Sequence, residues 1–204
     1  MTITVYHNPE SGHAHRVVAF LSVLGVQFHA QTVDLDAGEN RTPGFLELNP
    51  LGEVPVLVDE AVVLRDSTAA LVYLAKKYDP SGTWLPEEAR RAAEVQGWLA
   101  TSSKDVYESL CKARLSAVFE LPFDYAPAVE RSETLLRDLF EPHLGRQSWL
   151  VGDRPTIADI ANYGYVATAP ESGISLEPFP NVVAWVRRVE KLEGFICMPQ
   201  SAAT

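Results

Sequence analysis

The chain has 204 residues, of which 47% are apolar and 22% charged, enough for one large or two small domains with a core. Its net charge of −10 and pI of about 4.9 disfavour nucleic acid and membrane partners, because both present anionic surfaces. No apolar run approaches the roughly 20 residues that span a bilayer, and the N-terminus lacks the basic start and apolar core of a signal peptide, so we expect a cytoplasmic protein.

Residues 1–79 alternate strand and helix patterns. Strand patterns cover 3–6, 28–35, 54–59 and 61–64, and helix patterns cover 15–25, 42–50 and 66–78. The order β-α-β-α-β-β-α predicts a mixed sheet flanked by helices.

Residues 79–86 contain two prolines and a glycine and predict a linker. Beyond them only helical patterns remain, at 87–119, 126–145, 156–170 and 181–192. The fold class is therefore α/β plus all-α, with a first domain over 1–79 and a helical domain over 87–204. At the start of the third helical pattern, Thr156 and Asp159 have the spacing of a capping box, which we interpret as a stability device.

The spacing of the cysteines and histidines supports neither a metal site nor a disulfide. Cys111 and Cys197 are isolated, as is usual in a reducing compartment, and the five histidines do not fall at ligand spacing. We expect no metal and no cofactor.

The order of motifs resembles a known family. A β-α-β-α-β-β-α domain, "NPLGEVPVL", "DS" at a helix start and "TIADI" in a helical domain are similar to the cytosolic glutathione transferases. The phrases "YHNPESGHAHRV" and "GISLEPFPNVVAWVRRVE" resemble bacterial members that use serine. The resemblance covers essentially the whole chain. It implies a thioredoxin-like first domain, glutathione as a substrate and a detoxifying homodimer.

By this resemblance, Val54-Pro55 is a cis peptide bond that exposes the backbone of Val54 to the cysteinyl part of glutathione, as an added strand would pair. The proline interrupts an apolar run that otherwise reads as a strand, and an edge proline is the alternative. Asp66 and Ser67 then begin a helix whose free N–H groups suit the γ-glutamyl carboxylate, with Asp66 facing the ammonium. An ordinary N-cap is compatible with this role.

Ser11 is the expected catalytic residue, donating a hydrogen bond to the glutathione sulfur from a helix start. In this role Ser11 stabilises a thiolate on the substrate and is not itself a nucleophile. The chain contains no Gly-x-Ser-x-Gly motif, which argues against a serine hydrolase. Tyr6 lies roughly where tyrosine-using classes place their hydroxyl, and Asn8, His13 and backbone groups are further alternatives.

Two positions depart from the family. Glu53 stands where relatives have Gln or Lys and would repel the glycine carboxylate of glutathione, while Asn40-Arg41 replaces a His-Lys pair. Arg41 is the expected partner of that carboxylate.

In the helical domain, Asp105 is expected to reach the partner subunit's γ-glutamyl site, with a solvated helix charge as the alternative. The electrophile pocket is expected from aromatic and polar side chains, namely Tyr107, Arg114, Phe119 and Tyr163. The resemblance therefore implies conjugation of glutathione to small apolar electrophiles. A glutathione-dependent disulfide reductase or peroxidase and a non-catalytic glutathione-binding module remain alternatives.

Overall fold

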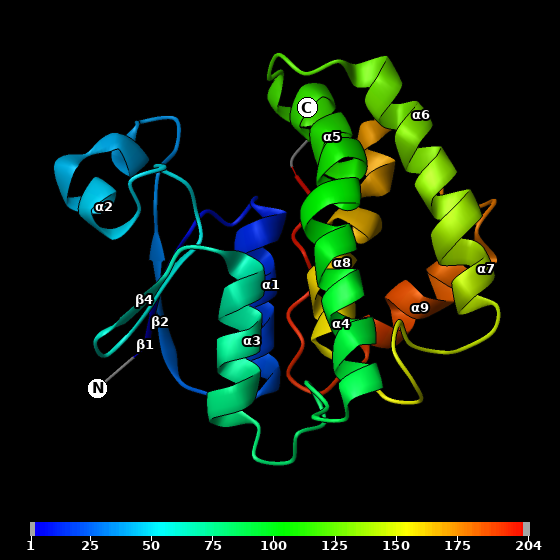
Figure 1. The fold of residues 1–204 in the computed structure, drawn as a ribbon. Helices are drawn as coiled ribbons and strands as arrows, with labels where there is room; N and C mark the ends of the chain where they lie inside the picture. Colours follow the sequence, from blue (N-terminus) through cyan, green and yellow to red (C-terminus); the bar gives the residue numbers. More distant parts are fainter. Residues whose placement is uncertain (1–2, 202–204) are drawn as a thin grey trace.

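The computed structural model describes residues 3–201, which form a small α/β domain beside a larger helical domain (Figure 1). The first domain contains a four-stranded sheet of order β2-β1-β3-β4. Its strands are β1 (Ile3–His7), β2 (Phe28–Thr32), β3 (Val56–Asp59) and β4 (Val62–Leu64). β1 pairs parallel with β2 and antiparallel with β3, and β3 pairs antiparallel with β4. The predicted mixed sheet is confirmed.

Helices cover both faces of the sheet, as the alternation of side chains along β1 requires. Ile3 and Val5 face α1 (Gly12–Val23) and α3 (Ser67–Tyr78) within the main apolar core. Tyr6 faces the other side, in a small cluster with Phe45 of α2 (Pro43–Leu48), which follows the short helix η1 (Glu39–Arg41). In Figure 1, α1 and α3 lie between the sheet and the helical domain. The start of α1 therefore lies at the boundary between the domains.

The helical domain consists of long helices with π-helical stretches. Its elements in chain order are α4 (Ala89–Thr101), η2 (Ser102–Cys111), α5 (Lys112–Phe119), α6 (Tyr125–Leu135), η3 (Leu136–Phe140), α7 (Glu141–Leu144), α8 (Ile157–Ala167), η4 (Ala169–Ser172) and α9 (Pro180–Glu190). The segment 87–119, predicted as one helix, is the continuous run of α4, η2 and α5. Among residues 3–201, no helix is long and apolar enough to cross a membrane.

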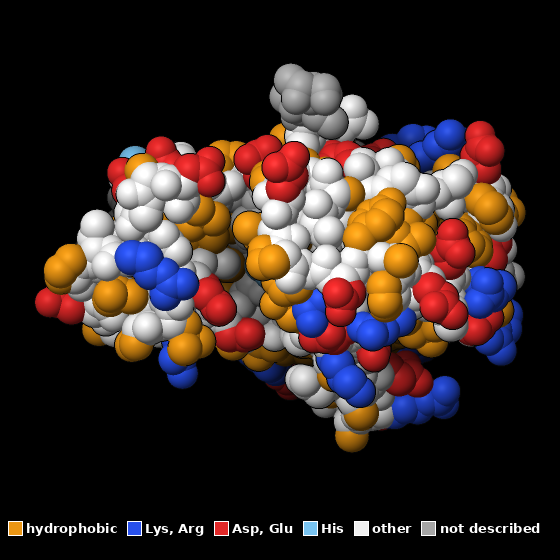
Figure 2. Space-filling view, turned by 90° about the horizontal axis from the view of Figure 1, so that it is seen from above, with side chains coloured by type: hydrophobic (Ala, Val, Ile, Leu, Met, Phe, Trp, Pro, Cys, Tyr) orange, Lys and Arg blue, Asp and Glu red, His pale blue; other side chains and the backbone are white. Residues whose placement is uncertain are grey.

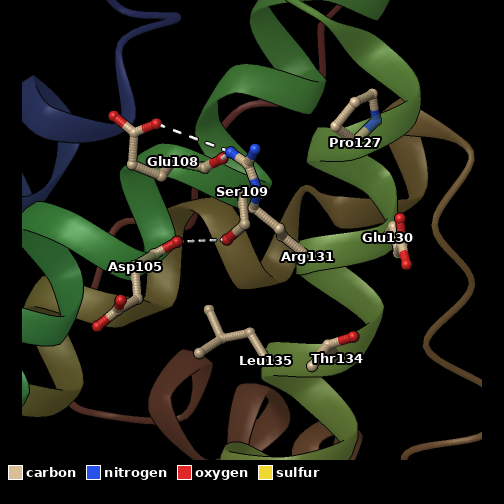
Figure 3. Close-up of a pocket in the computed structure, with 8 residues that line it drawn as sticks. All are labelled: Asp105, Glu108, Ser109, Pro127, Glu130, Arg131, Thr134 and Leu135. Carbon is tan, nitrogen blue, oxygen red and sulfur yellow. Dashed lines mark hydrogen bonds and ion pairs between the residues drawn. The ribbon is translucent and has the colours of Figure 1, made fainter.

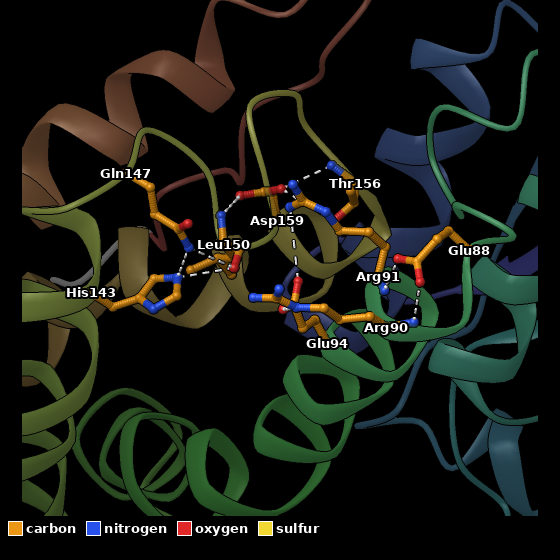
Figure 4. A network of polar contacts seen from close by, with 9 residues as sticks. All are labelled: Glu88, Arg90, Arg91, Glu94, His143, Gln147, Leu150, Thr156 and Asp159. Atoms are coloured by element: carbon orange, nitrogen blue, oxygen red, sulfur yellow. Dashed lines mark hydrogen bonds and ion pairs between the residues drawn. The ribbon is translucent and has the colours of Figure 1, made fainter.

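The capping box at the start of α8 is confirmed and extends into a buried network (Figure 4). The fully buried Asp159 carboxylate accepts hydrogen bonds from the N–H groups of Thr156 and Leu150, both at 2.9 Å, and from Trp185 Nε1 at 2.8 Å. Burial raises the pKa of Asp159 to about 6, although these hydrogen bonds oppose the rise. The carboxylate thus joins α8, α9 and the loop before α8.

The two domains share one apolar core, and their backbones approach closely where α1 crosses α8. A Cβ on Gly12 would lie 2.8 Å from the Tyr165 ring, and a Cβ on Gly164 would lie 3.6 Å from Gly12 Cα. The first turn of α1 is therefore seated directly on the helical domain.

After α9, the segment 191–201 returns along α1. Ser22 Oγ donates to the Gly194 carbonyl at 2.6 Å, and His15 Nε2 donates to the Ile196 carbonyl at 2.7 Å. Phe195 packs edge-on against Tyr163, with ring centroids 4.8 Å apart. This tail (residues 191–201) links the second domain to the first.

Candidate active site

A tight turn presents Ser11 at the end of β1. The Ser11 N–H donates to the Asn8 carbonyl at 3.0 Å, and the Glu10 N–H donates to Asn8 Oδ1 at 2.9 Å. Asn8 Nδ2 also donates to the Val33 carbonyl at 3.4 Å, which ties the turn to the segment after β2. Asn8 therefore shapes the turn through its own side chain and backbone.

Ser11 is the N-cap of α1, and its hydroxyl is half-buried. Its Oγ accepts a hydrogen bond from the Ala14 N–H at 3.2 Å. Because the oxygen is the acceptor in that bond, the hydroxyl proton is free to be donated to a ligand. The positive end of the helix dipole lies at the same place. The cap and the expected catalytic role are thus compatible in one side chain.

The loop before β3 offers an unpaired stretch of backbone. Val54-Pro55 is cis, as expected, and Val54 precedes the first residue of β3. Within residues 3–201, neither the N–H nor the carbonyl of Val54 has a hydrogen-bond partner. A short extended ligand could pair with both groups, as an added strand would.

The buried Asn49 holds this loop in place. Its Nδ2 donates to the Glu53 carbonyl at 2.8 Å, and its Oδ1 accepts from the Leu51 N–H at 3.1 Å. The side chain is only 1% exposed. Sequence reasoning did not single out Asn49, although an amide beside a Pro-Leu-Gly turn is a recognisable signal.

Asp66 and Ser67 form the N-terminus of α3. Asp66 Oδ1 caps the helix by accepting from the Ala69 N–H and from Thr68 Oγ1, both at 2.7 Å. Burial alone would raise the pKa of Asp66, but these hydrogen bonds and the nearby Arg16 hold it below its usual value. Asp66 is therefore ionised at neutral pH and suited to an ammonium.

Behind Ser67 lies Arg16, a buried cation that sequence reasoning missed. Arg16 Nη1 donates to Ser67 Oγ at 3.3 Å, and the side chain is 2% exposed. Among the described residues it has no ion-pair partner, and its Nε has no hydrogen-bond partner. A buried guanidinium without a carboxylate favours an anion at this helix end. The signal in the sequence was an arginine inside an otherwise apolar helix pattern.

Arg41 lies against the loop that contains Glu53. Arg41 Nη1 donates to the Leu51 carbonyl at 3.1 Å, and a Cβ on Gly52 would lie 2.6 Å from the same nitrogen. Asn40 Nδ2 donates to the Gly52 carbonyl at 2.7 Å. Gly52 has a φ of 64°, which also favours glycine there. Arg41 thus lies beside the loop that contains Glu53, and its pairing with the glycine carboxylate stays a prediction.

The facing wall comes from the helical domain. The Tyr107 ring lies 6.0 Å from the His13 ring, which lies 5.1 Å from the Tyr165 ring. Burial raises the pKa of Tyr107, and the nearby Glu53 carboxylate adds to the rise. Burial lowers the pKa of His13 to about 3, so this imidazole is neutral at physiological pH. A mostly uncharged aromatic surface therefore stands beside Ser11. Viewed from above, a furrow runs between the two domains (Figure 2).

The structure does not bring all of the expected residues to this wall. Tyr163 is 1% exposed, and its hydroxyl donates to Glu190 Oε1 at 2.9 Å, away from Ser11. Tyr165, which sequence reasoning did not name, faces the start of α1 instead. Both tyrosines contact α1: the Tyr163 ring lies 5.7 Å from the His15 ring, whereas Tyr165 lies against Gly12, next to Ser11.

Arg114 is buried, and Phe119 is half-buried beside it. Arg114 is 2% exposed and forms an ion pair with Glu171 at 2.8 Å, with its guanidinium 5.2 Å from the Phe119 ring centroid. Among the alternatives to Ser11, Tyr6 packs edge-on against Phe45 at 6.2 Å, on the sheet face opposite α1.

Asp105 lies outside the furrow, in a groove between η2 and α6 (Figure 3). The groove has a volume of about 510 Å³ and is lined by Asp105, Glu108, Ser109, Pro127, Glu130, Arg131, Thr134 and Leu135.

Comparison with known proteins identifies the family. The glutathione S-transferase N-terminal domain model matches residues 1–76, and the C-terminal domain model matches residues 109–193. Glutathione S-transferase 3 of Zea mays is 34% identical over 208 residues, covering 95% of this chain and 91% of that protein.

Solved structures show the same similarity. The crystal structure of a glutathione S-transferase from Pseudomonas fluorescens aligns with a TM-score of 0.89 at 30% identity, covering 97% of this chain and 99% of that one. A glutathione transferase homologue from Lodderomyces elongisporus, solved with two glutathione molecules per subunit, aligns with a TM-score of 0.86 at 25% identity and 95% coverage of both chains. The chain belongs to the glutathione S-transferase family.

Proposed function

We propose that this glutathione transferase uses Ser11 to hold glutathione as a thiolate and transfers its sulfur to a small apolar electrophile. The observation that carries the proposal is the geometry of Ser11. Its oxygen accepts from the Ala14 N–H, which leaves the hydroxyl proton available at the positive end of α1.

The energy required is within reach of this arrangement. A free thiol has a pKa of about 8.5, so only a few per cent is thiolate at neutral pH. Lowering that pKa by about two units requires about 2.7 kcal/mol of preference for the anion. A hydrogen bond to a charged group contributes about 1.5–3 kcal/mol, and a helix N-terminus adds about 0.3–1 kcal/mol.

Each part of the tripeptide has a complementary group. The unpaired backbone of Val54 suits the cysteinyl backbone, and Pro55 holds the bend. Ser67 and the N-terminus of α3 suit the γ-glutamyl carboxylate, with Asp66 for the ammonium. Arg41 lies beside the loop at the glycine end, where it can offset Glu53.

The electrophile binds against the aromatic wall opposite Ser11. Tyr107 and the neutral His13 supply this surface, and the buried Tyr165 ring packs against His13. Uncharged rings favour a small apolar or aromatic electrophile over an ionic one.

We also propose a homodimer, in which the groove that contains Asp105 faces the partner subunit. The groove carries Asp105, Glu108 and Glu130 and lies outside the furrow of its own subunit, which supports a role of Asp105 toward a ligand of the partner (Figure 3). Sedimentation analysis should show a dimer, and Asp105→Ala should weaken glutathione binding if the groove contributes.

Two variants of Ser11 distinguish its role as a helix cap from its proposed catalytic role. Ser11→Ala removes both the cap and the donor, whereas Ser11→Asp retains a cap acceptor without a free hydroxyl proton. Both variants should lose conjugation by about 100-fold, by analogy with removal of one donor from an anion-stabilising site. Only Ser11→Ala should lose about 1 kcal/mol of stability.

Thermal unfolding with millimolar glutathione is the matching binding measurement. Wild type and Ser11→Ala should both be stabilised, because Ser11 is one contact among several. Full conjugation by both Ser11 variants would overturn the assignment. Binding without turnover of any electrophile would favour a binding module instead.

A further inference from the structure

Arg114 belongs to the helical domain but contacts the active-site turn of the first domain. Its Nη1 donates to the Glu10 carbonyl at 2.7 Å, across 104 positions of sequence. Glu10 immediately precedes Ser11. The Arg114 side chain is only 2% exposed, so water does not compete freely for this contact.

The guanidinium is held in a closed set of hydrogen bonds. Its Nε donates to Glu171 Oε2 at 2.8 Å, and its Nη2 donates to Ser201 Oγ at 2.6 Å. The Ser201 N–H donates to the other Glu171 oxygen at 3.1 Å. Because the guanidinium is planar and rigid, fixing two of its nitrogens also fixes the direction of Nη1. Glu171 neutralises the charge, so Arg114 acts by position.

The Glu10–Ser11 peptide unit is consequently held from both sides. Its carbonyl accepts from Arg114, and its N–H donates to the Asn8 carbonyl at 3.0 Å. A peptide group is planar, so anchoring both ends prevents it from rotating. Rotation of this plane would change the backbone geometry of Ser11 and move its Oγ.

We propose that Arg114 is a positioning residue for Ser11, and that the tail completes this arrangement by delivering Ser201. The proposal rests on the proposed function, in which the Ser11 hydroxyl lowers the pKa of the glutathione thiol. It replaces the expectation that Arg114 is a polar group of the electrophile pocket. The guanidinium orients the turn and does not touch the reacting atoms.

The test removes Arg114 without leaving Glu171 as an unpaired buried charge. The double variant Arg114→Met/Glu171→Gln is compared with wild type for stability, for KM of glutathione and for the pH profile of kcat/KM for the electrophile at saturating glutathione. The rise of that profile reports the pKa of the bound thiol and should shift upward by about one pH unit. Below the shifted pKa, kcat/KM should fall about tenfold, while KM for glutathione changes less than about threefold.

Two further variants make the result decisive. Val182→Ala controls for lost stability, because Val182 is a fully buried core residue of α9. It should leave the pH profile unchanged. Arg114→Lys keeps a charge beside Glu171 but lacks the rigid fork, so it should shift the profile in the same direction even if the double variant does not fold.

An unshifted profile in either folded Arg114 variant would overturn the inference. The Ser11→Ala profile separates this outcome from failure of the proposed function. If Ser11→Ala shifts the profile and the Arg114 variants do not, only the positioning role fails. If Ser11→Ala leaves it unshifted, the assignment of Ser11 fails.

Discussion

Two glycines with the same backbone conformation allow the attachment of the tail to be measured. Gly194 and Gly38 both have a φ of 74°, so alanine at either position carries the cost of a left-handed L-residue, about 1–2 kcal/mol. At Gly38 a Cβ would meet nothing within 4 Å, whereas at Gly194 it would lie 2.7 Å from the backbone carbonyl oxygen of Ser22. The difference between the two variants therefore isolates the contact of the tail with α1.

The loss of stability expected for Gly194→Ala follows from the contacts that break when the tail moves away from α1. Moving the tail away from Ser22 breaks the hydrogen bond from Ser22 Oγ to the Gly194 carbonyl, worth about 1 kcal/mol. It also withdraws Phe195 from the rings of Tyr163 and His15, which forfeits part of the about 1.5–3 kcal/mol gained by burying a phenylalanine. Gly194→Ala should cost about 3–5 kcal/mol in total, and Gly38→Ala about 1–2 kcal/mol.

Urea denaturation at neutral pH measures both variants against wild type. In a chain of this size each kcal/mol also lowers the melting temperature by about 2–4 °C. If Gly194→Ala and Gly38→Ala lose the same stability, the tail is not held against α1 in solution. Thermal scans with and without glutathione should show the same order of stability.

Three further predictions concern charge and helix propensity. The pKa of Asp159 rises from 3.8 to about 6 on folding, so the folded state binds this proton more tightly than the unfolded state does. The free energy of unfolding should therefore fall by about 3 kcal/mol as the pH rises through that interval. Relative to Asp159→Asn, wild type should therefore lose stability between about pH 4 and pH 6 in urea titrations, and parallel curves would refute the shift. Glu53→Gln should tighten glutathione binding about threefold by calorimetry, and looser binding would show that Glu53 contributes favourably. Gly97→Ala in the exposed interior of α4 should add about 0.5–1 kcal/mol, because a Cβ there meets nothing within 4 Å; a loss would reveal an unseen contact.

Local signals in the sequence predicted the features that depend on neighbouring residues. The capping box, the N-cap at Asp66 and the helix start at Ser11 each involve groups a few positions apart. Their chemistry is therefore visible in a short window of sequence, whereas the cis bond before Pro55 was expected only from the resemblance to the family.

Long-range partners could not be predicted in this way. Arg114 meets Glu10 and Ser201 at separations of 104 and 87 positions, and no local pattern indicates either contact. The choice between Tyr163 and Tyr165 depended on the rotation of α8 against α1, which periodicity does not fix when α8 is buried almost all round.

The contact between Arg114 and the Glu10 carbonyl has a consequence for exchanging domains among family members. A chimera that keeps residues 1–79 and takes its helical half from a relative retains the first-domain groups that we propose recognise the tripeptide. By our proposal, its Ser11 hydroxyl is aligned only if the new half supplies an equivalent donor to that carbonyl. The new half must therefore also carry equivalents of Arg114, Glu171 and the tail with Ser201, whichever electrophile pocket is chosen.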